Sequence, residues 1–325
     1  MKRAIEAAQA AFPQWAGMPA PARGAILDKA SQIIAARLED MATCLTREEG
    51  KTLAEARIEV ARARDIFKYY AGEGWRMGGD VLPASSADTL LYTRREPLGV
   101  IGLITPWNFP IAIPAWKMAP ALVYGNTVVF KPASLAPQVS LMMVEALMEA
   151  GLPAGVVNYV TGSGKVAGDE IASNPIVKGI SFTGSYAVGS GIYARAVKNM
   201  TRVQLEMGGK NPMVVLNDAD LKLAVNLAVL GGFGLTGQAC TATSRVIVEE
   251  GIADRYAEAL AEAARNLKVG NGLESGVQMG PAVNQDQLET DLMYVEIGQK
   301  EGAKLLAGGS RAMDGGFYVQ PTVFD

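Results

Sequence analysis

Three side chains stand in settings where they could do chemistry: Cys240, Glu206 and Asn108. Cys240 lies in glycine-rich backbone just before an expected strand, a pattern that allows either a packed thiol or a nucleophile on a turn. Glu206 precedes two glycines at an expected strand end, where a surface charge at a turn is the simplest interpretation. Asn108 belongs to the loop T-P-W-N-F-P, residues 105–110, whose two prolines and two aromatics could present an amide group in fixed geometry.

The chain contains no histidine. This excludes the catalytic triads and dyads, and the metal sites, that need an imidazole. If the protein is an enzyme, its base is expected to be a carboxylate or a lysine, and its nucleophile must be activated in another way. The second cysteine, Cys44, falls on an apolar helical stripe and is interpreted as a small buried core side chain.

Two glycine-rich turns each follow an expected strand and open an expected helix. The first contains Gly162, Gly164 and Gly168 and resembles a dinucleotide fingerprint whose last glycine comes one residue late. The second is F-T-G-S at residues 182–185, where Ser185 suits a helix N-cap and free N–H groups could receive a pyrophosphate. Ordinary turns and capping explain each one alone, but two such strand ends in one sheet favour a dinucleotide site.

These motifs need a framework, and the sequence predicts one of the α/β class. Residues 1–75 have helical apolar spacing, and residues 76–97 indicate a hairpin. Strands are expected at 100–104, 127–130, 156–160 and 180–182, with helices at 111–124, 137–150, 165–173 and 186–198. A second α/β region is expected from residue 208, with strands at 213–216 and 245–248 and a helix at 254–267. Near-continuous apolar strands alternating with helices predict doubly wound parallel sheets, which bind ligands beyond the carboxyl ends of their strands.

Composition narrows the class of protein further. The chain has 325 residues, of which 49 % are hydrophobic and 19 % charged, and this length predicts two domains with real cores. A net charge of −3 gives no electrostatic footprint for nucleic acid. Two cysteines are too few for a disulfide scaffold, so we expect reduced thiols and a cytoplasmic location. No apolar run is long enough to span a membrane, and no signal peptide is expected.

Five motifs together resemble the aldehyde dehydrogenase superfamily. They are T-P-W-N-F-P, V-F-K-P-A, F-T-G-S, L-E-x-G-G-K-N-P and G-Q-x-C-T-A, which occur in the family's order over essentially the whole chain. Cys240 follows Glu206 by 34 residues (240 − 206), which is the family's spacing. Within the superfamily the chain most resembles 2-oxoglutarate-semialdehyde and succinate-semialdehyde dehydrogenases.

The resemblance implies a role for each of the three reactive side chains. Cys240 would attack the aldehyde carbon and form a thiohemiacetal, whose oxyanion the Asn108 amide and the Cys240 backbone N–H would hold. Loss of a hydride to NADP and/or NAD would leave a thioester, and Glu206 would activate the water that hydrolyses it to the acid. Lys117 is expected near the catalytic loop.

The resemblance also implies a set of cofactor contacts. They are Ile104, Thr105, Pro106, Trp107, Lys131, Ser134, Gly162, Gly164, Gly184, Ser185 and Gly208. In NAD-preferring members of the family a glutamate often follows K-P-A and binds the adenosine ribose. Ser134 stands there in this chain, and serine beside Lys131 would admit a 2′-phosphate, so we expect NADP to be accepted.

Substrate choice depends on a single departure from the family pattern. Many succinate-semialdehyde enzymes have arginine directly before the lysine, where this chain has Trp116. This favours 2-oxoglutarate semialdehyde and leaves betaine-aldehyde-like substrates open.

The domains implied are an NAD(P)-binding domain of residues 1–79 and 98–207, an oligomerisation hairpin of residues 80–97 and a catalytic domain of residues 208–325. The full-length parent would be a homodimer or homotetramer. The chain stops shortly before the family's E-x-F-G-P segment, so the catalytic domain is expected to be incomplete at its C-terminus. The alternative interpretation is therefore a catalytically incompetent truncated fragment that at most binds dinucleotide.

Overall fold

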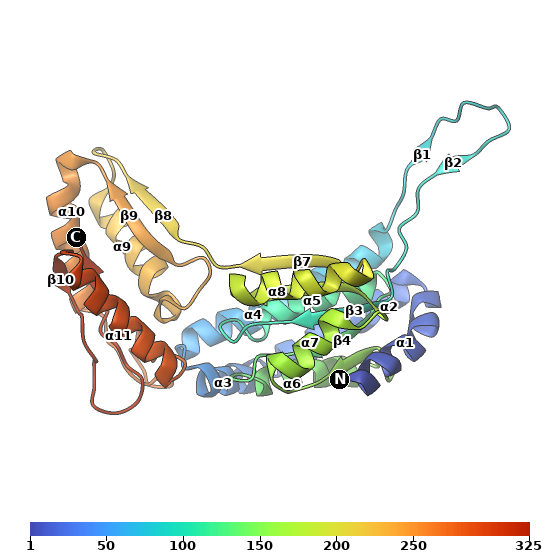
Figure 1. The fold of residues 1–325 in the computed structure, drawn as a ribbon, viewed down its shortest axis with the longest axis horizontal. Coiled ribbons are helices and arrows are strands. Elements are labelled where there is room, and N and C mark those ends of the chain that lie inside the picture. Colours follow the sequence, from blue (N-terminus) through green and yellow to red (C-terminus); the bar gives the residue numbers. More distant parts are fainter. The chain divides into compact units, whose positions relative to one another are not determined.

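The computed structural model describes residues 1–325 and divides them into two compact units. Unit 1 comprises Met1–Ala42 and Arg57–Met207, and unit 2 comprises Thr43–Ala56 and Gly208–Asp325. The elements are labelled in Figure 1. Four helices open the chain: α1 (Lys2–Gly17), α2 (Ala20–Ala36), α3 (Leu38–Glu49) and α4 (Leu53–Arg76).

Unit 1 is built on a five-stranded parallel sheet with the order β5-β4-β3-β6-β7. The strands are β3 (Val100–Ile104), β4 (Thr127–Lys131), β5 (Val157–Tyr159), β6 (Val177–Gly184) and β7 (Arg202–Met207). Helices α5 (Ala112–Val123) and α6 (Gln138–Glu149) connect β3 to β4 and β4 to β5. After β5 the chain crosses back, and β6 pairs with the edge of β3 that β4 leaves free. The connection that follows β3 therefore leads toward β4, whereas the connection that follows β6 leads in the opposite direction, toward β7.

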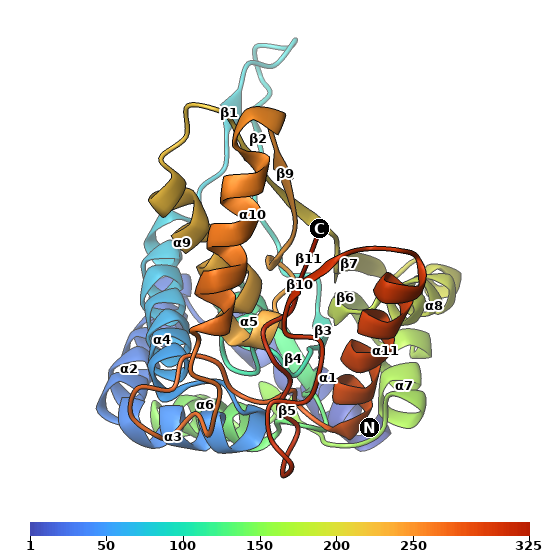
Figure 2. The same ribbon diagram turned by 90° about the vertical axis from the view of Figure 1, so that its left-hand side faces the viewer.

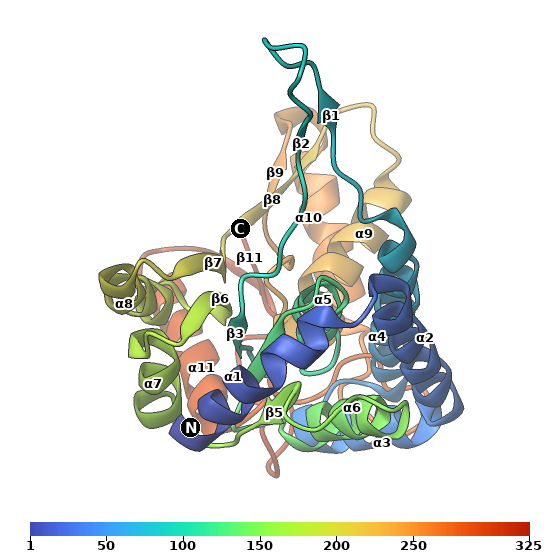
Figure 3. The ribbon, with the colours of Figure 1, turned by 90° about the vertical axis from the view of Figure 1, so that its right-hand side faces the viewer.

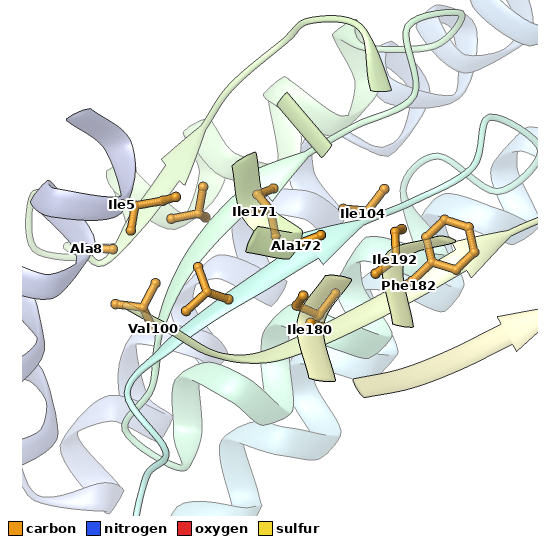
Figure 4. Close-up of a cluster of buried hydrophobic side chains, with 12 residues drawn as sticks. Ile5, Ala8, Val100, Ile104, Ile171, Ala172, Ile180, Phe182 and Ile192 are labelled. Carbon is orange, nitrogen blue, oxygen red and sulfur yellow. The ribbon is translucent and has the colours of Figure 1, made fainter. Parts of the chain in front are cut away.

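One face of this sheet is covered by α1, α7 (Asp169–Ser173) and α8 (Tyr186–Ala196). Their apolar side chains meet alternate residues of the strands in one buried cluster, shown in Figure 4. Ile5 and Ala8 come from α1, Val100 and Ile104 from β3, and Phe182 from β6. This packing fixes where each strand ends, and it therefore positions the loops that follow.

The predicted parallel sheet and its helices are confirmed, with small differences at the ends of elements. The helix expected at 165–173 begins as a π-helical turn, Gly164–Gly168, which continues into α7. The strand expected at 180–182 extends over all of β6. Helix α7 ends at Ser173, and Asn174 follows it in an extended conformation.

A long hairpin leaves unit 1 between α4 and β3. Its strands β1 (Val81–Leu82) and β2 (Leu91–Tyr92) are antiparallel and exposed on both faces. Figures 1 and 3 show it projecting beyond the helices of its own unit. The hairpin predicted for residues 76–97 is thus present, with only two paired residues in each strand.

Unit 2 contains a second, smaller α/β arrangement. Strands β8 (Asn211–Val215) and β9 (Thr243–Val248) are parallel and are joined by α9 (Leu221–Phe233). In Figure 2, α9 lies beside α10 (Glu250–Arg265), and the two share a buried apolar cluster with the strands. The chain then forms α11 (Gln285–Lys300) and an antiparallel pair, β10 (Leu305–Ala307) and β11 (Val323–Phe324).

The structure corrects the interpretation of Cys44. The apolar stripe that contains it is divided between α2 and α3 at Arg37, and Cys44 is half-buried instead of a fully buried core side chain. Burial and the nearby Glu48 carboxylate raise the pKa of its thiol to about 11, so it stays protonated. No helix combines the length and apolarity needed to cross a bilayer.

Candidate active site

Cys240 lies on an exposed turn of unit 2, between α9 and β9. Its carbonyl oxygen accepts a hydrogen bond from Asn211 Nδ2 at 2.8 Å, and the same amide donates to the carbonyl of Ala242 at 3.0 Å. The backbone N–H of Cys240 donates to no group in the structure. The sequence left open whether Cys240 is a packed thiol or a nucleophile on a turn. Because Cys240 is exposed, the packed thiol is excluded.

The backbone leading to this turn is strained. Leu235 and Thr236 both have positive φ angles, 55° and 57°, and Gly237 follows at 68°. A non-glycine residue in this left-handed region costs about 1–3 kcal/mol and persists only where its surroundings hold it. Gly237 is required as glycine, because a Cβ there would come within 2.9 Å of the Gly232 carbonyl oxygen.

Three side chains hold the strained segment in place. Glu55 accepts a hydrogen bond from the Leu235 N–H at 2.7 Å, and Thr236 Oγ1 donates to the Gly280 carbonyl at 3.1 Å. Gln238 Oε1 accepts from the Val283 N–H at 2.9 Å. All these groups belong to unit 2, so the position of Cys240 is set within its own unit.

In unit 1 the other candidate residues gather at the carboxyl edge of the sheet. Glu206 on β7 lies beside Thr183 on β6, and Ile104 on β3 pairs with Phe182 on β6 and Lys131 on β4. Asn108 is half-buried in the loop that follows β3. Glu59 Oε1 fixes the end of this loop by accepting hydrogen bonds from the N–H groups of Ile111 and Ala112, at 3.0 and 3.1 Å.

A chain of hydrogen bonds connects Lys117 to Glu206 across this edge. Lys117 Nζ donates to Ser181 Oγ at 2.8 Å, and Ser181 Oγ donates to Gln204 Oε1 at 2.5 Å. Gln204 Nε2 then donates to Glu206 Oε1 at 3.1 Å. Lys117 is only 9 % exposed. This burial lowers the pKa of its ammonium group to about 8, against the opposing effect of Glu206.

Two groups of the predicted dinucleotide contacts, residues 104–107 and 184–185, lie at the ends of β3 and β6, the neighbouring strands between which the strand order reverses. Loops that leave adjacent strands in opposite directions open a crevice, and open α/β sheets bind nucleotides there. Thr105, directly after β3, has a buried hydroxyl with no hydrogen-bond partner. Across from it, Ser185 caps α8 by accepting from the Val188 N–H, which confirms the capping role but leaves the N–H groups of Tyr186 and Ala187 without acceptors.

The remaining contacts differ in exposure. Ser134 and Gly208 are exposed, whereas Lys131 is buried and its Nζ donates to the Pro132 carbonyl at 2.7 Å. Burial lowers the pKa of Lys131. A Cβ at Gly164 would meet nothing within 4 Å, so the turn after β5 is open to a ligand. Two surface cavities of unit 1, of about 290 and 440 Å³, are lined by none of these residues.

Sequence reasoning did not identify three positioning residues: Glu55, Glu59 and Asn211. Glu55 could have been identified from the sequence, because Thr52-x-x-Glu55 is the pattern of a capping box. The structure contains both hydrogen bonds of this motif: the Thr52 N–H donates to the Glu55 carboxylate, and the Glu55 N–H donates to Thr52 Oγ1. Asn211 belongs to a motif that was noted for Glu206. Glu59 bonds the backbone more than fifty residues away, and no local pattern signals such a contact.

The structure thus brings together Asn108, Lys117, Glu206 and the expected cofactor residues 104–107, 131, 184 and 185 within unit 1. It places Cys240 in unit 2.

Comparisons with known proteins identify the family. The model of the aldehyde dehydrogenase family matches residues 1–325. The chain is 49 % identical, over all of its length and 67 % of the relative, to the alpha-ketoglutaric semialdehyde dehydrogenase of Bacillus subtilis. It is 47 % identical to the 2,5-dioxopentanoate dehydrogenase of Saccharolobus solfataricus, again over all of its length and 68 % of the relative. It therefore spans about two thirds of these relatives.

Solved structures show the same fold. An NADP-dependent enzyme of Escherichia coli has a TM-score of 0.97 and 39 % identity, over 99 % of this chain and 67 % of the other. An aldehyde dehydrogenase of Bacillus cereus, solved as an NAD⁺ complex, has a TM-score of 0.97 and 40 % identity, over 99 % of this chain and 66 % of the other.

Proposed function

The chain belongs to the aldehyde dehydrogenase family, and on this premise we propose that it oxidises a carboxylate-bearing semialdehyde to the acid with NADP or NAD. The exposed Cys240 thiol on its constrained turn is the observation that carries the proposal. Similarity to the alpha-ketoglutaric semialdehyde dehydrogenase and the 2,5-dioxopentanoate dehydrogenase supports 2-oxoglutarate semialdehyde as the substrate.

Cys240 begins the reaction. Its thiolate attacks the aldehyde carbon, a C–S bond forms, and the carbonyl oxygen becomes an oxyanion. The Asn108 side-chain amide and the backbone N–H of Cys240 are the two donors for this oxyanion. One such donor is worth about 3–4 kcal/mol of transition-state stabilisation, so two supply a large part of the rate.

Groups along the carboxyl edge of the unit 1 sheet fit a dinucleotide. The partnerless Thr105 hydroxyl, the two unbonded N–H groups at the start of α8 and the open turn at Gly164 are groups that a nicotinamide dinucleotide would satisfy. When bound, such a dinucleotide would accept the hydride that the thiohemiacetal loses as it becomes a thioester. Ile104–Trp107, Lys131, Ser134, Gly162, Gly184, Ser185 and Gly208 would hold it.

Glu206 completes the reaction by removing a proton from a water molecule. The resulting hydroxide attacks the thioester carbon, the C–S bond breaks, and the acid leaves with regeneration of the Cys240 thiolate, while Glu206 retains the proton of the water until it passes to solvent. Gln204 holds one carboxylate oxygen of Glu206, which leaves the other oxygen for the water.

Two cysteines allow a matched test. Aldehyde-dependent reduction of NADP or NAD by wild type is expected to disappear in Cys240→Ala and to persist in Cys44→Ala. Dinucleotide binding without turnover in wild type would instead support the alternative, a truncated fragment that only binds the cofactor. Turnover that survives in Cys240→Ala would refute the proposed nucleophile.

We also propose that the hairpin of residues 80–97 joins the protein to further copies of itself, as a homodimer or homotetramer. Its exposed apolar residues support this assembly. The two unpaired cysteines are consistent with a cytoplasmic location.

A further inference from the structure

Arg62 differs from the other arginines on its helix. Helix α4 carries four, and Arg57, Arg64 and Arg76 each pair with a carboxylate, of Glu39, Asp65 and Glu73 respectively. The Arg62 guanidinium makes no hydrogen bond and no ion pair. It lies over the indole ring of Trp116 on α5, with its central carbon 5.6 Å from the ring centroid. Its planar fork of N–H donors is therefore exposed and has no acceptor.

This stacked pair lies close to the candidate active site. Glu59, one helical turn before Arg62, accepts hydrogen bonds from the first N–H groups of α5, where the loop that carries Asn108 ends. Trp116 is one turn further along α5, about 6 Å of helix rise from Ala112. The next residue, Lys117, begins the hydrogen-bonded chain to Glu206. One face of α4 thus extends from Glu59, at the end of the loop that carries Asn108, to Arg62.

We propose that the guanidinium of Arg62, stacked on Trp116, binds the carboxylate of an anionic aldehyde substrate. A guanidinium can donate two parallel hydrogen bonds to one carboxylate, a geometry that lysine cannot reproduce. Trp116 is 46 % exposed, and its ring excludes water from one face of the guanidinium, which strengthens the pairing. This inference rests on the proposed function and assigns the residue that selects its substrate class.

The test compares a charged aldehyde with a neutral one. In Arg62→Met we expect kcat/KM for 2-oxoglutarate semialdehyde to fall about 100-fold, mainly through KM, while kcat/KM for butanal changes less than about 2-fold. Arg62→Lys should retain part of the activity on the anionic aldehyde, because it keeps the charge but not the fork. The matched control is Arg64→Met, on the same helix, which should alter neither substrate by more than about 2-fold.

Equal losses of kcat/KM for the two aldehydes in Arg62→Met would show that Arg62 only supports the fold. Unchanged kcat/KM for both would show that Arg62 does not bind substrate. Either result overturns the inference. If wild type oxidises neither aldehyde, the proposed function has failed, and binding of glutarate by calorimetry decides separately. Glutarate should then bind wild type and Arg64→Met but not Arg62→Met. Absence of binding to wild type, or equal binding to all three, would overturn the inference.

Discussion

Glu206 and Cys240 act in different halves of the proposed reaction, and this separates the effects of their substitution. In Glu206→Gln the thiol still attacks and the hydride is still lost, but no carboxylate activates the water. We expect a burst of reduced cofactor, one equivalent per site, followed by a steady rate lowered about 100- to 10,000-fold, as for loss of a general base. Stopped-flow absorbance measures both phases. A steady rate equal to that of wild type, without a burst, would assign the base to another group.

Lys117 carries a charge that the fold disfavours. Burial lowers its pKa from 10.5 to about 8, which corresponds to about 3 kcal/mol. Below pH 8 the folded state bears this cost in full. Between about pH 8 and 10.5 the unfolded chain binds the proton and the folded chain does not, so the free energy of unfolding rises with pH.

The variant Lys117→Met removes this titration. It loses one hydrogen bond to Ser181, worth about 1 kcal/mol, and should still be more stable than wild type at pH 7. The difference should shrink as pH rises toward 9.5, where wild type has lost the charge. Urea unfolding at both pH values measures it, and a difference that is independent of pH would contradict the lowered pKa.

Ser134 bears on the choice of dinucleotide. Its side chain is exposed after β4, whereas the neighbouring Lys131 is buried, so the adenosine ribose would meet Ser134 first. We expect NADP to be accepted, and Ser134→Glu to shift the ratio of kcat/KM toward NAD by about 10-fold or more, because a carboxylate repels the 2′-phosphate. A preference of wild type for NAD above roughly 100-fold, measured with both cofactors at one aldehyde concentration, would refute the first expectation.

At the scale of elements, the N-terminus of α4 and the turn that leads to Cys240 are held by the same side chain, Glu55. One oxygen of Glu55 caps α4 and the other holds the strained Leu235. Glu55→Ala should therefore lower both the stability of unit 2, by about 1–3 kcal/mol, and the turnover rate. The control is Glu250→Ala, which removes another first-turn glutamate from a helix of unit 2. Thermal unfolding and steady-state rates measure the two effects, and lower stability with unchanged turnover would make the contact structural only.

Strands and helices of unit 1 could be predicted because their signals are local. The apolar runs at Val100–Ile104 and Thr127–Lys131, and the caps at Asn174 and Ser185, are visible in the sequence itself. The reactive side chains were identifiable as motifs. The contacts that position them were not, because Glu59 to Ile111 and Lys117 to Ser181 join segments more than fifty residues apart.

The strained turn before Cys240 was also beyond prediction. Neither Leu235 nor Thr236 favours a positive φ, and the hydrogen bonds that hold this segment, such as those to Glu55 and Gly280, come from residues far away in the sequence. Cys44 was misjudged for a related reason. Its helical stripe was read as continuous, whereas the helix ends at Arg37 and a new one begins.

For the whole molecule, the two functions of the proposed enzyme are divided between the units. The dinucleotide residues other than Gly208, together with Glu206, belong to unit 1, and Cys240 and its supporting contacts belong to unit 2. Binding and chemistry can therefore be lost separately, which is why the proposed function and its alternative are distinguished by turnover and not by cofactor binding.

The hairpin is the other feature of the whole molecule that calls for explanation. Val81 and Leu90 are 76 % and 75 % exposed, and the strands pair only at Val81–Tyr92 and Leu82–Leu91. An isolated two-stranded hairpin is marginally stable in water at best, and exposed edges with apolar side chains favour pairing with another chain. We therefore expect this hairpin to be stabilised by a second copy of the protein.

Leu90→Asp tests this expectation, because a carboxylate inside an apolar interface has no partner there and disfavours assembly. The control is Ser85→Asp, which adds the same charge at the exposed hairpin loop. Sedimentation velocity should show wild type and Ser85→Asp as oligomers and Leu90→Asp shifted toward the monomer. If all three sediment as the same species, the hairpin does not hold the subunits together, and its apolar side chains must serve another surface.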